Sequence, residues 1–163
     1  MTTFEAIMAS TDFPMLVVTT RGASGENSGC LVGFATQCSI DPSHFLVCLS
    51  KKNHTYAVAK RADIMVVHQL RDDDKELARL FGEETGDEVD KFADISWSPG
   101  PGRVPVLADV DWFAGRIQQR FDCGDHVAHL LAVLPDGRAT RAEADADQFG
   151  SAEAQELDAG HEA

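Results

Sequence analysis

The apolar residues of this chain lie in short runs separated by turn-forming segments, and this pattern constrains the fold most. The longest runs are residues 15–18, 64–67 and 130–134. None approaches the ~20 apolar residues that a membrane-spanning helix needs. Short runs bounded by Gly, Pro, Ser and Asn are typical of buried strands. The pattern therefore predicts a mainly β protein.

Six strands follow from this pattern. They cover residues 13–20, 30–36, 45–50, 63–70, 109–123 and 126–134. The first two form a hairpin around a turn at residues 21–29, and Gly33 marks a bulge or a close backbone approach. Residues 97–105, with three prolines, predict a loop, and residues 135–137 (Pro-Asp-Gly) predict a turn.

Two short helices accompany the strands. Residues 53–61 predict one helix, with Asn53 as its N-cap. The other begins at Asp72 or Asp73 and carries an apolar stripe at i, i+3 and i+4, with one more helical turn at residues 87–92. The elements together predict an antiparallel β-barrel decorated by short helices.

Composition suits one domain with an acidic end. The chain has 163 residues, of which 44% are hydrophobic, and a net charge of −13. This charge argues against a nucleic-acid backbone or an anionic membrane surface as the partner. Residues 142–163 hold seven acidic residues and no Lys or Arg. We expect a folded domain over residues 1–141 and a flexible acidic tail over residues 142–163. The N-terminus has no basic start and no apolar signal core, so we expect a cytoplasmic protein.

The chain has four cysteines, Cys30, Cys38, Cys48 and Cys123, and none of them forms a C-x-x-C pair. In a cytoplasmic protein this favours free thiols, mostly buried in strands. A disulfide or a zinc site is the less favoured interpretation.

His126 and His129 lie three residues apart, a spacing that would suit a metal site on a helix. The segment is short, follows a glycine turn and becomes apolar, which indicates a strand. Residues three apart on a strand point to opposite faces. The pattern therefore predicts no metal site. His129 is expected to be exposed or hydrogen-bonded in a structural role, and His126, beside Asp125, stays a site candidate.

Two polar segments at strand ends are the candidates for ligand binding. The first contains Thr36, Gln37 and Ser39, where backbone N–H and C=O groups can meet a flat ligand with a polar edge. From this segment alone, an ordinary connecting loop is the favoured interpretation. The second, at residues 50–55, combines two lysines with a helix start, a combination that favours phosphate binding. An N-cap with two solvated lysines is the alternative there. No G-x-S-x-G, H-E-x-x-H, P-loop or G-x-G-x-x-G motif is present.

The order of these segments is what makes the chain recognisable. PMLVVTT is followed by SGCLVGFATQCSIDP, FLVCLSKKNHT, DIMVVHQL, LARLFG, PVL and CGDH. In number, order and spacing these segments resemble the flavin reductase-like family of FMN-binding split-barrel proteins. The resemblance covers residues 13–133. It implies a homodimeric split β-barrel with short flanking helices that binds FMN or FAD.

The resemblance also implies roles for individual residues. Thr36, Gln37, Cys38 and Ser39 would line the isoalloxazine edge, and Lys51, Asn53, His54 and Thr55 would hold the phosphate end. Asp125 and His126 would lie near the flavin face as catalytic residues, where NADH or NADPH docks. Arg79, Phe81 and Gly82 match a segment that covers the pocket.

The implied activity is hydride transfer from NADH or NADPH to the flavin, with a monooxygenase component as a possible recipient of the reduced flavin. A non-catalytic split-barrel protein that binds flavin or a related cofactor is the alternative, followed by a dimeric scaffold without a working pocket.

Overall fold

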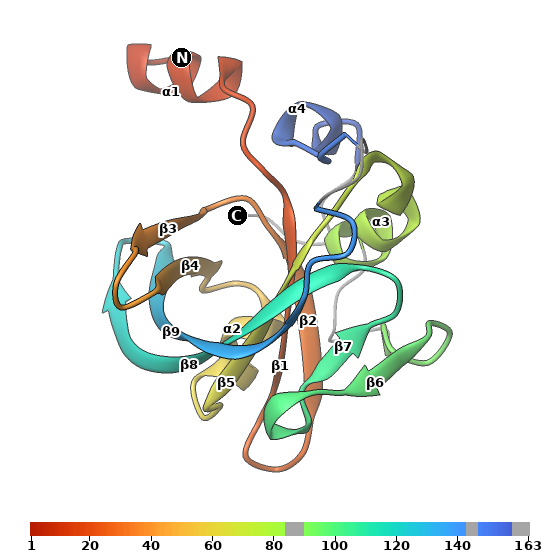
Figure 1. The fold of residues 1–163 in the computed structure, drawn as a ribbon. Coiled ribbons are helices and arrows are strands. Elements are labelled where there is room, and N and C mark those ends of the chain that lie inside the picture. The colour runs from red at the N-terminus through yellow and green to blue at the C-terminus, as the bar shows by residue number, and fades with distance from the viewer. Residues whose placement is uncertain (84–89, 143–146, 158–163) are drawn as a thin grey trace.

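The computed structural model describes residues 1–83, 90–142 and 147–157. Figure 1 shows a strongly curved sheet with helices around it. The strands are β1 (Leu16–Arg21), β2 (Asn27–Val32), β3 (Ala35–Ser39), β4 (His44–Ser50), β5 (Ile64–Gln69), β6 (Trp97–Pro99), β7 (Pro105–Leu107), β8 (Asp111–Asp122) and β9 (His126–Arg138). The α-helices are α1 (Thr3–Ser10), α2 (His54–Ala59), α3 (Lys75–Glu83) and α4 (Ser151–Ala154), and short 3-10 turns are η1 (Asp72–Asp74) and η2 (Pro101–Arg103).

The connection between β2 and β3 shows why the sheet is a barrel. Seven strands pair antiparallel in the order β2-β1-β5-β8-β9-β4-β3, so β2 and β3 are the two edges. Only Gly33 and Phe34 join these two edge strands. Two residues span ~10 Å at most. The sheet must therefore curl until its edges lie close together, and the gap between β2 and β3 is the split in the barrel. This confirms the predicted mainly β split-barrel fold.

Most predicted strands are confirmed, with three corrections. The strand predicted at residues 30–36 is in fact the end of β2 and the start of β3, because the chain crosses the split at Gly33. The predicted loop at residues 97–105 holds the short antiparallel pair β6 and β7 around η2. The predicted turn at residues 135–137 is part of β9, which pairs with β8 as far as Arg138.

Strand β8 also departs from simple alternation. Its pairing with β9 shifts register between Phe113 and Gly115 and again between Ile117 and Gln119. A bulge inserts an extra residue, so side chains beyond it change face. At the first shift the extra residues lie on β9, and only the second shift adds a residue to β8. The two faces expected from period-2 alternation therefore hold as far as Ile117, which packs in the barrel interior with Phe113, and are wrong beyond it.

The predicted helices are confirmed with small changes at their starts. Asn53 caps α2, with its side chain accepting a hydrogen bond from the Thr55 backbone N–H at 2.9 Å. The second helix is preceded by η1, whose N-cap is Arg71 rather than Asp72 or Asp73. Of the helical turn expected at residues 87–92, residues 87–89 lie outside the described residues, and residues 90–92 form a turn rather than a helix.

Strands β1 and β5 are buried on both faces. One face of β1 contributes Leu16 and Val18 to the barrel interior, and Val17 points to a second core under α3. Helix α3 packs closely on β2 at Gly29, where an added Cβ would lie 2.8 Å from the Phe81 ring. Two-sided burial explains why these strands are continuous apolar runs rather than alternating ones.

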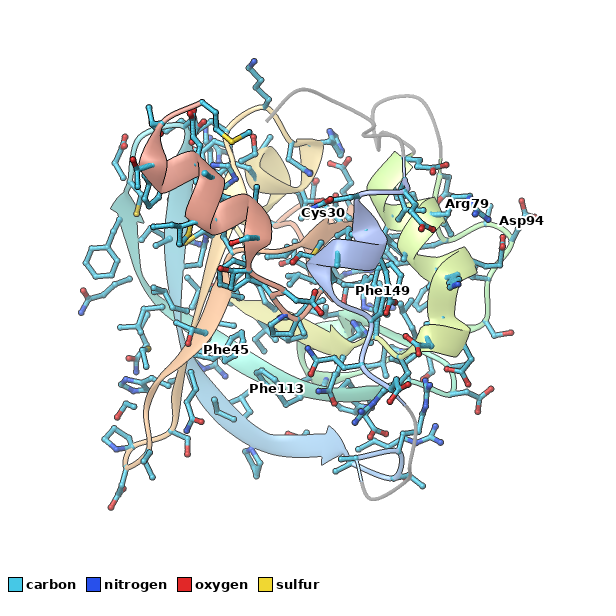
Figure 2. All side chains as sticks on the ribbon, turned by 90° about the horizontal axis from the view of Figure 1, so that it is seen from above. Cys30, Phe45, Arg79, Asp94, Phe113 and Phe149 are labelled. Atoms are coloured by element: carbon cyan, nitrogen blue, oxygen red, sulfur yellow. The ribbon has the colours of Figure 1, made fainter. Side chains whose placement is uncertain are left out.

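Part of the expected acidic tail belongs to the fold. Phe149 is 1% exposed in the second core and Figure 2 shows it beside α4. Its backbone N–H donates to Leu70 at 3.0 Å, and its carbonyl accepts from Met15 at 3.0 Å. The expectation of a flexible tail from residue 142 therefore does not hold for residues 147–157.

Helix α1 is different from the other helices. Each of its residues is exposed, and Figure 1 shows it standing clear of the barrel. Thr2 and Glu5 form a capping box at its start. Within the described residues, the structure contains no helix long and apolar enough to cross a membrane.

Candidate functional site

The first predicted segment lies on β3, at one edge of the barrel sheet. Thr36, Gln37 and Cys38 are exposed, and Ser39 is half-buried. A register shift between Gln37 and Ser39 places a bulge at Cys38. An edge strand leaves one row of backbone N–H and C=O groups outside the ladder. The segment can therefore offer backbone hydrogen bonds, as the sequence predicted.

A cavity of about 800 Å³ opens beside Thr36 and Gln37 at the mouth of the barrel. Its apolar walls include Phe45, Phe113 and Trp112. Phe45 and Phe113, labelled in Figure 2, meet edge to face with ring centroids 5.1 Å apart. Such a cavity, mostly apolar with a few polar groups, suits a flat aromatic ligand.

The second predicted segment runs from the end of β4 into α2. The Thr55 side chain is buried, and its hydroxyl lies 2.9 Å from that of Ser28, so here it fastens α2 to β2. His54 Nε2 lies 2.7 Å from the Glu26 carboxylate. Asn53 caps α2 by accepting from the Thr55 N–H, and Lys51, two residues earlier, supplies a cationic side chain that can bind an anion.

The turn between β8 and β9 folds back onto this end of β4. The Lys51 N–H donates to the Asp125 carbonyl at 2.9 Å, and Lys51 Nζ lies 2.8 Å from the Asp122 carboxylate. Gly124 makes the turn possible, because its φ of 125° is in a region that side chains disfavour. The hydrogen bond and charge of Asp122 raise the pKa of Lys51, so the amine stays protonated at neutral pH.

Asp125 and His126 form a pair at the start of β9. Asp125 Oδ1 lies 2.8 Å from His126 Nδ1, and the hydrogen bond from this ring, with its charge, lowers the pKa of Asp125. The ring of His126 lies 4.8 Å from the ring of Phe34, centroid to centroid. Phe34 is 61% exposed and was missed by the sequence analysis, where an aromatic residue after a glycine looked like part of a strand.

The structure thus gathers the predicted residues at two places rather than one. Thr36 and Gln37 border the cavity, whereas Asp125 and His126 lie beside Lys51. Gln37 pairs with Phe45, and Lys51 follows six residues later along the chain. At ~3.3 Å per residue, Gln37 and Lys51 are ~20 Å apart along β4, whereas Thr36, which pairs with Leu46, is only ~13 Å from Ser50, the partner of His126. Only an elongated ligand can reach both.

Other residues singled out in the sequence are structural. His129 is fully buried, with Nδ1 3.0 Å from the Val127 carbonyl, and burial lowers its pKa. Phe81 is buried in the second core, and Arg79 pairs with Glu76 on the surface of α3. In the parts of the chain that the structure describes, His, Cys, Asp and Glu nowhere form a group of three suited to a metal.

Comparison with known proteins identifies the family. The model of the flavin reductase like domain matches residues 8–148, which include both polar segments and the Gly-Asp-His turn. The chain belongs to this family.

Three relatives illustrate the similarity. The NADH flavin reductase of Kitasatospora aureofaciens is 32% identical over 138 residues, covering 83% of this chain and 71% of that protein. A probable flavin reductase of Rhizobium meliloti (strain 1021) is 31% identical over 68% of this chain. The reductase subunit HsaB of a flavin-dependent monooxygenase from Rhodococcus jostii (strain RHA1) is 31% identical over 61% of this chain. This chain spans only 35% of the Rhizobium protein and 52% of HsaB.

A solved structure supports the fold. The NADH:FAD oxidoreductase SgcE6 of Streptomyces globisporus C-1027 superposes with a TM-score of 0.76 at 21% identity, covering 90% of this chain and 84% of that one. At this level of identity the likeness concerns the barrel itself.

Proposed function

We propose that this protein is an NAD(P)H-dependent flavin reductase that transfers hydride from a nicotinamide to FMN or FAD. One observation carries the proposal. In a flavin reductase-like barrel, the polar edge of β3 lies beside an aromatic cavity, and β4, which pairs with β3, leads to the cationic Lys51. The relatives named for NADH and FAD support the choice of both cofactors.

The residues present fit a flavin. A flavin joins a flat ring with a polar edge to a chain that ends in phosphate. The cavity at Thr36 and Gln37 suits the ring, and the protonated Lys51, just beyond the end of β4, suits the phosphate. The elongated shape that the two places require is therefore the shape of this cofactor.

Each predicted residue has a role in this arrangement. Thr36, Gln37, Cys38 and Ser39 offer hydrogen bonds to the ring edge, and Lys51, Asn53 and His54 surround the phosphate. Thr55 acts by holding α2 in place through Ser28. Phe34 lies two residues before Thr36 and its ring contacts that of His126, so Phe34 and the Asp125–His126 pair can give the nicotinamide nucleotide an aromatic and a polar contact near the ring site. A bound flavin supplies the hydride acceptor, and the protein orients the two rings.

We further propose that the protein acts as a homodimer and passes reduced flavin to a monooxygenase component. Among its relatives, HsaB is the reductase subunit of such an enzyme. The dimer is supported by α1, where Phe4, Ile7 and Met8 are 70%, 54% and 39% exposed. These residues share one face at i, i+3 and i+4. An isolated eight-residue helix is marginal in water, so α1 needs a surface to pack on. A second copy of the chain provides one.

The visible spectrum of the purified protein tests the activity. With added FMN or FAD, we expect a bound-flavin spectrum that bleaches when NADH or NADPH is added without oxygen. Flavin that binds but is not reduced by either nucleotide would instead support the binding-protein alternative. Absence of flavin binding would overturn the proposal.

The phosphate role of Lys51 can be tested separately with riboflavin, which lacks the phosphate. Lys51→Ala should weaken FMN binding about tenfold and leave riboflavin binding unchanged, because one charge-assisted hydrogen bond is lost. Asp122→Asn should strengthen FMN binding, since it releases Lys51 from its ion pair. Lys60→Ala, at the other end of α2, is the matched control. Equal losses of affinity for FMN and riboflavin would show that Lys51 does not bind the phosphate.

A further inference from the structure

The C-terminal end of α2 is held by an arginine from the barrel wall. Arg120 lies on β8, and its Nη2 donates to the carbonyl oxygens of Ala59 and Ala62, each at a distance of 2.9 Å. Ala59 is the last residue of α2, and Ala62 follows shortly before β5. The last carbonyl groups of a helix have no partner within the helix, and a cation beside them also interacts favourably with the helix dipole. Arg120 therefore caps the C-terminal end of α2.

The strand pairing shows how Arg120 reaches this helix. Arg120 pairs with His129 on β9, and His129 pairs with Val47 on β4. Residues directly opposite each other lie on the same face of a sheet. Val47 belongs to the core of the barrel interior, and so does Ala59. The side chain of Arg120 therefore extends from the barrel wall toward the end of the barrel where α2 packs.

The same short stretch of β8 also contacts the chain just before α2. Two residues after Arg120, the Asp122 carboxylate lies 2.8 Å from Lys51 Nζ. The end of β8 thus holds both ends of the segment that begins at Lys51 and includes α2. One contact is with the lysine before the helix, and the other is with the carbonyl groups at its end.

This support matters because α2 is short. The helix has six residues, and an isolated helix of this length is marginal in water. Its N-cap is Asn53 and its first residue is His54, whose Nε2 lies 2.7 Å from the Glu26 carboxylate. A shift of α2 along or about its axis would move the side chains of Asn53 and His54 relative to Lys51.

We propose that Arg120 is a positioning residue for the flavin phosphate, because by fixing the C-terminal end of α2 it sets the places of Asn53 and His54 relative to Lys51. This inference rests on the proposed function, in which these three side chains surround the phosphate. Arg120 acts through α2 and needs no contact with the flavin itself.

Fluorescence titrations of the full chain with FMN and with riboflavin test this role. Arg120→Met keeps a long apolar side chain and removes the hydrogen-bond donors. It should weaken FMN binding about fivefold, as expected when one hydrogen-bonded arrangement is lost, and leave the binding of riboflavin, which lacks the phosphate, unchanged. Arg120→Lys keeps a donor and should recover part of the FMN affinity. The matched control is Arg116→Met, at an exposed position of β8, which should change neither affinity.

A double variant separates positioning of the phosphate site from general support of the fold. If Arg120 acts through the phosphate site, Arg120→Met should cost less FMN affinity in a protein that already carries Lys51→Ala than in the native sequence. Loss of general support would cost the same in both proteins. Urea unfolding of each variant shows that the titrated protein is folded.

The proposal is overturned if Arg120→Met weakens FMN and riboflavin binding equally, or if the folded variant binds FMN as tightly as the native protein does. If Arg120→Met does not fold, Arg120→Gln, which keeps one amide donor, is titrated and judged by the same two criteria. A native protein that binds FMN no more tightly than riboflavin would overturn the phosphate site itself, and this role with it.

Discussion

His68 shows at the scale of one residue how a tertiary environment fixes a protonation state. It is fully buried on β5, with Nδ1 2.9 Å from the Val17 carbonyl and Nε2 3.0 Å from the Leu107 backbone nitrogen. A carbonyl can only accept and an N–H can only donate, so Nδ1 carries the hydrogen and Nε2 accepts. Burial lowers the pKa of His68 from 6.5 to about 4, because the cation would lose its hydration.

This pKa predicts a loss of stability in mild acid. Between about pH 6.5 and pH 4 the unfolded chain binds a proton at His68 and the folded protein does not, so the free energy of unfolding falls as pH falls. The neutral His68 contributes about 3 kcal/mol to the free energy of unfolding. This contribution is fully present above pH 6.5 and is lost as the pH falls towards 4. Urea unfolding at several pH values measures the slope.

The control for this prediction is a histidine outside the core. His68→Gln should lower stability at pH 7 and flatten the slope between pH 6.5 and 4, whereas His44→Gln on β4 should leave the slope unchanged. Equal slopes for all three proteins would show that His68 does not stay neutral in the folded state.

At the scale of elements, residues 147–157 pair with and pack on the rest of the fold. Residues 148 and 150 form isolated bridges with Arg71 and Pro14, and Phe149 between them enters the second core. The acidic composition of this region predicts a solvated tail, because a single aromatic residue gives no periodic signal. Docking depends on a gap between β1 and α3 that exists only once the barrel has formed.

Truncating Phe149 tests this docking. Phe149→Ala should lower the free energy of unfolding by about 3–5 kcal/mol, as expected for a fully buried phenylalanine. Phe121→Ala, at a site 45% exposed, should cost less than about 1 kcal/mol. If both variants lose the same small amount in urea unfolding, the segment is not packed in solution.

At the scale of the whole molecule, α1 predicts the state of assembly. Light scattering coupled to size-exclusion chromatography should give twice the mass of the chain. Phe4→Glu together with Ile7→Glu should give a folded monomer, because charges on this face oppose its burial. Glu5→Gln, on the same helix, should stay dimeric. A native protein with the mass of a monomer would contradict the proposed dimer. Charged variants that still dimerise would show that α1 does not form the interface.

The sequence by itself determined the class of fold and the positions of most strands. Short apolar runs and turn residues are local signals, and the order of polar segments was enough to indicate the family that the comparison confirms. Candidate residues such as Thr36, Lys51 and His126 were chosen from the same local signals, and their roles stay predictions.

Only the tertiary structure decided which of these residues meet. Period-2 alternation does not report barrel closure, so the break at Gly33 and the exposure of Phe34 were not predicted. The pairing of β4 with β9 and the turn between β8 and β9 place His126 and Asp122 beside Lys51. These contacts join residues far apart in sequence, and they arise because a closed, twisted sheet brings strand ends together in a way that no local pattern encodes.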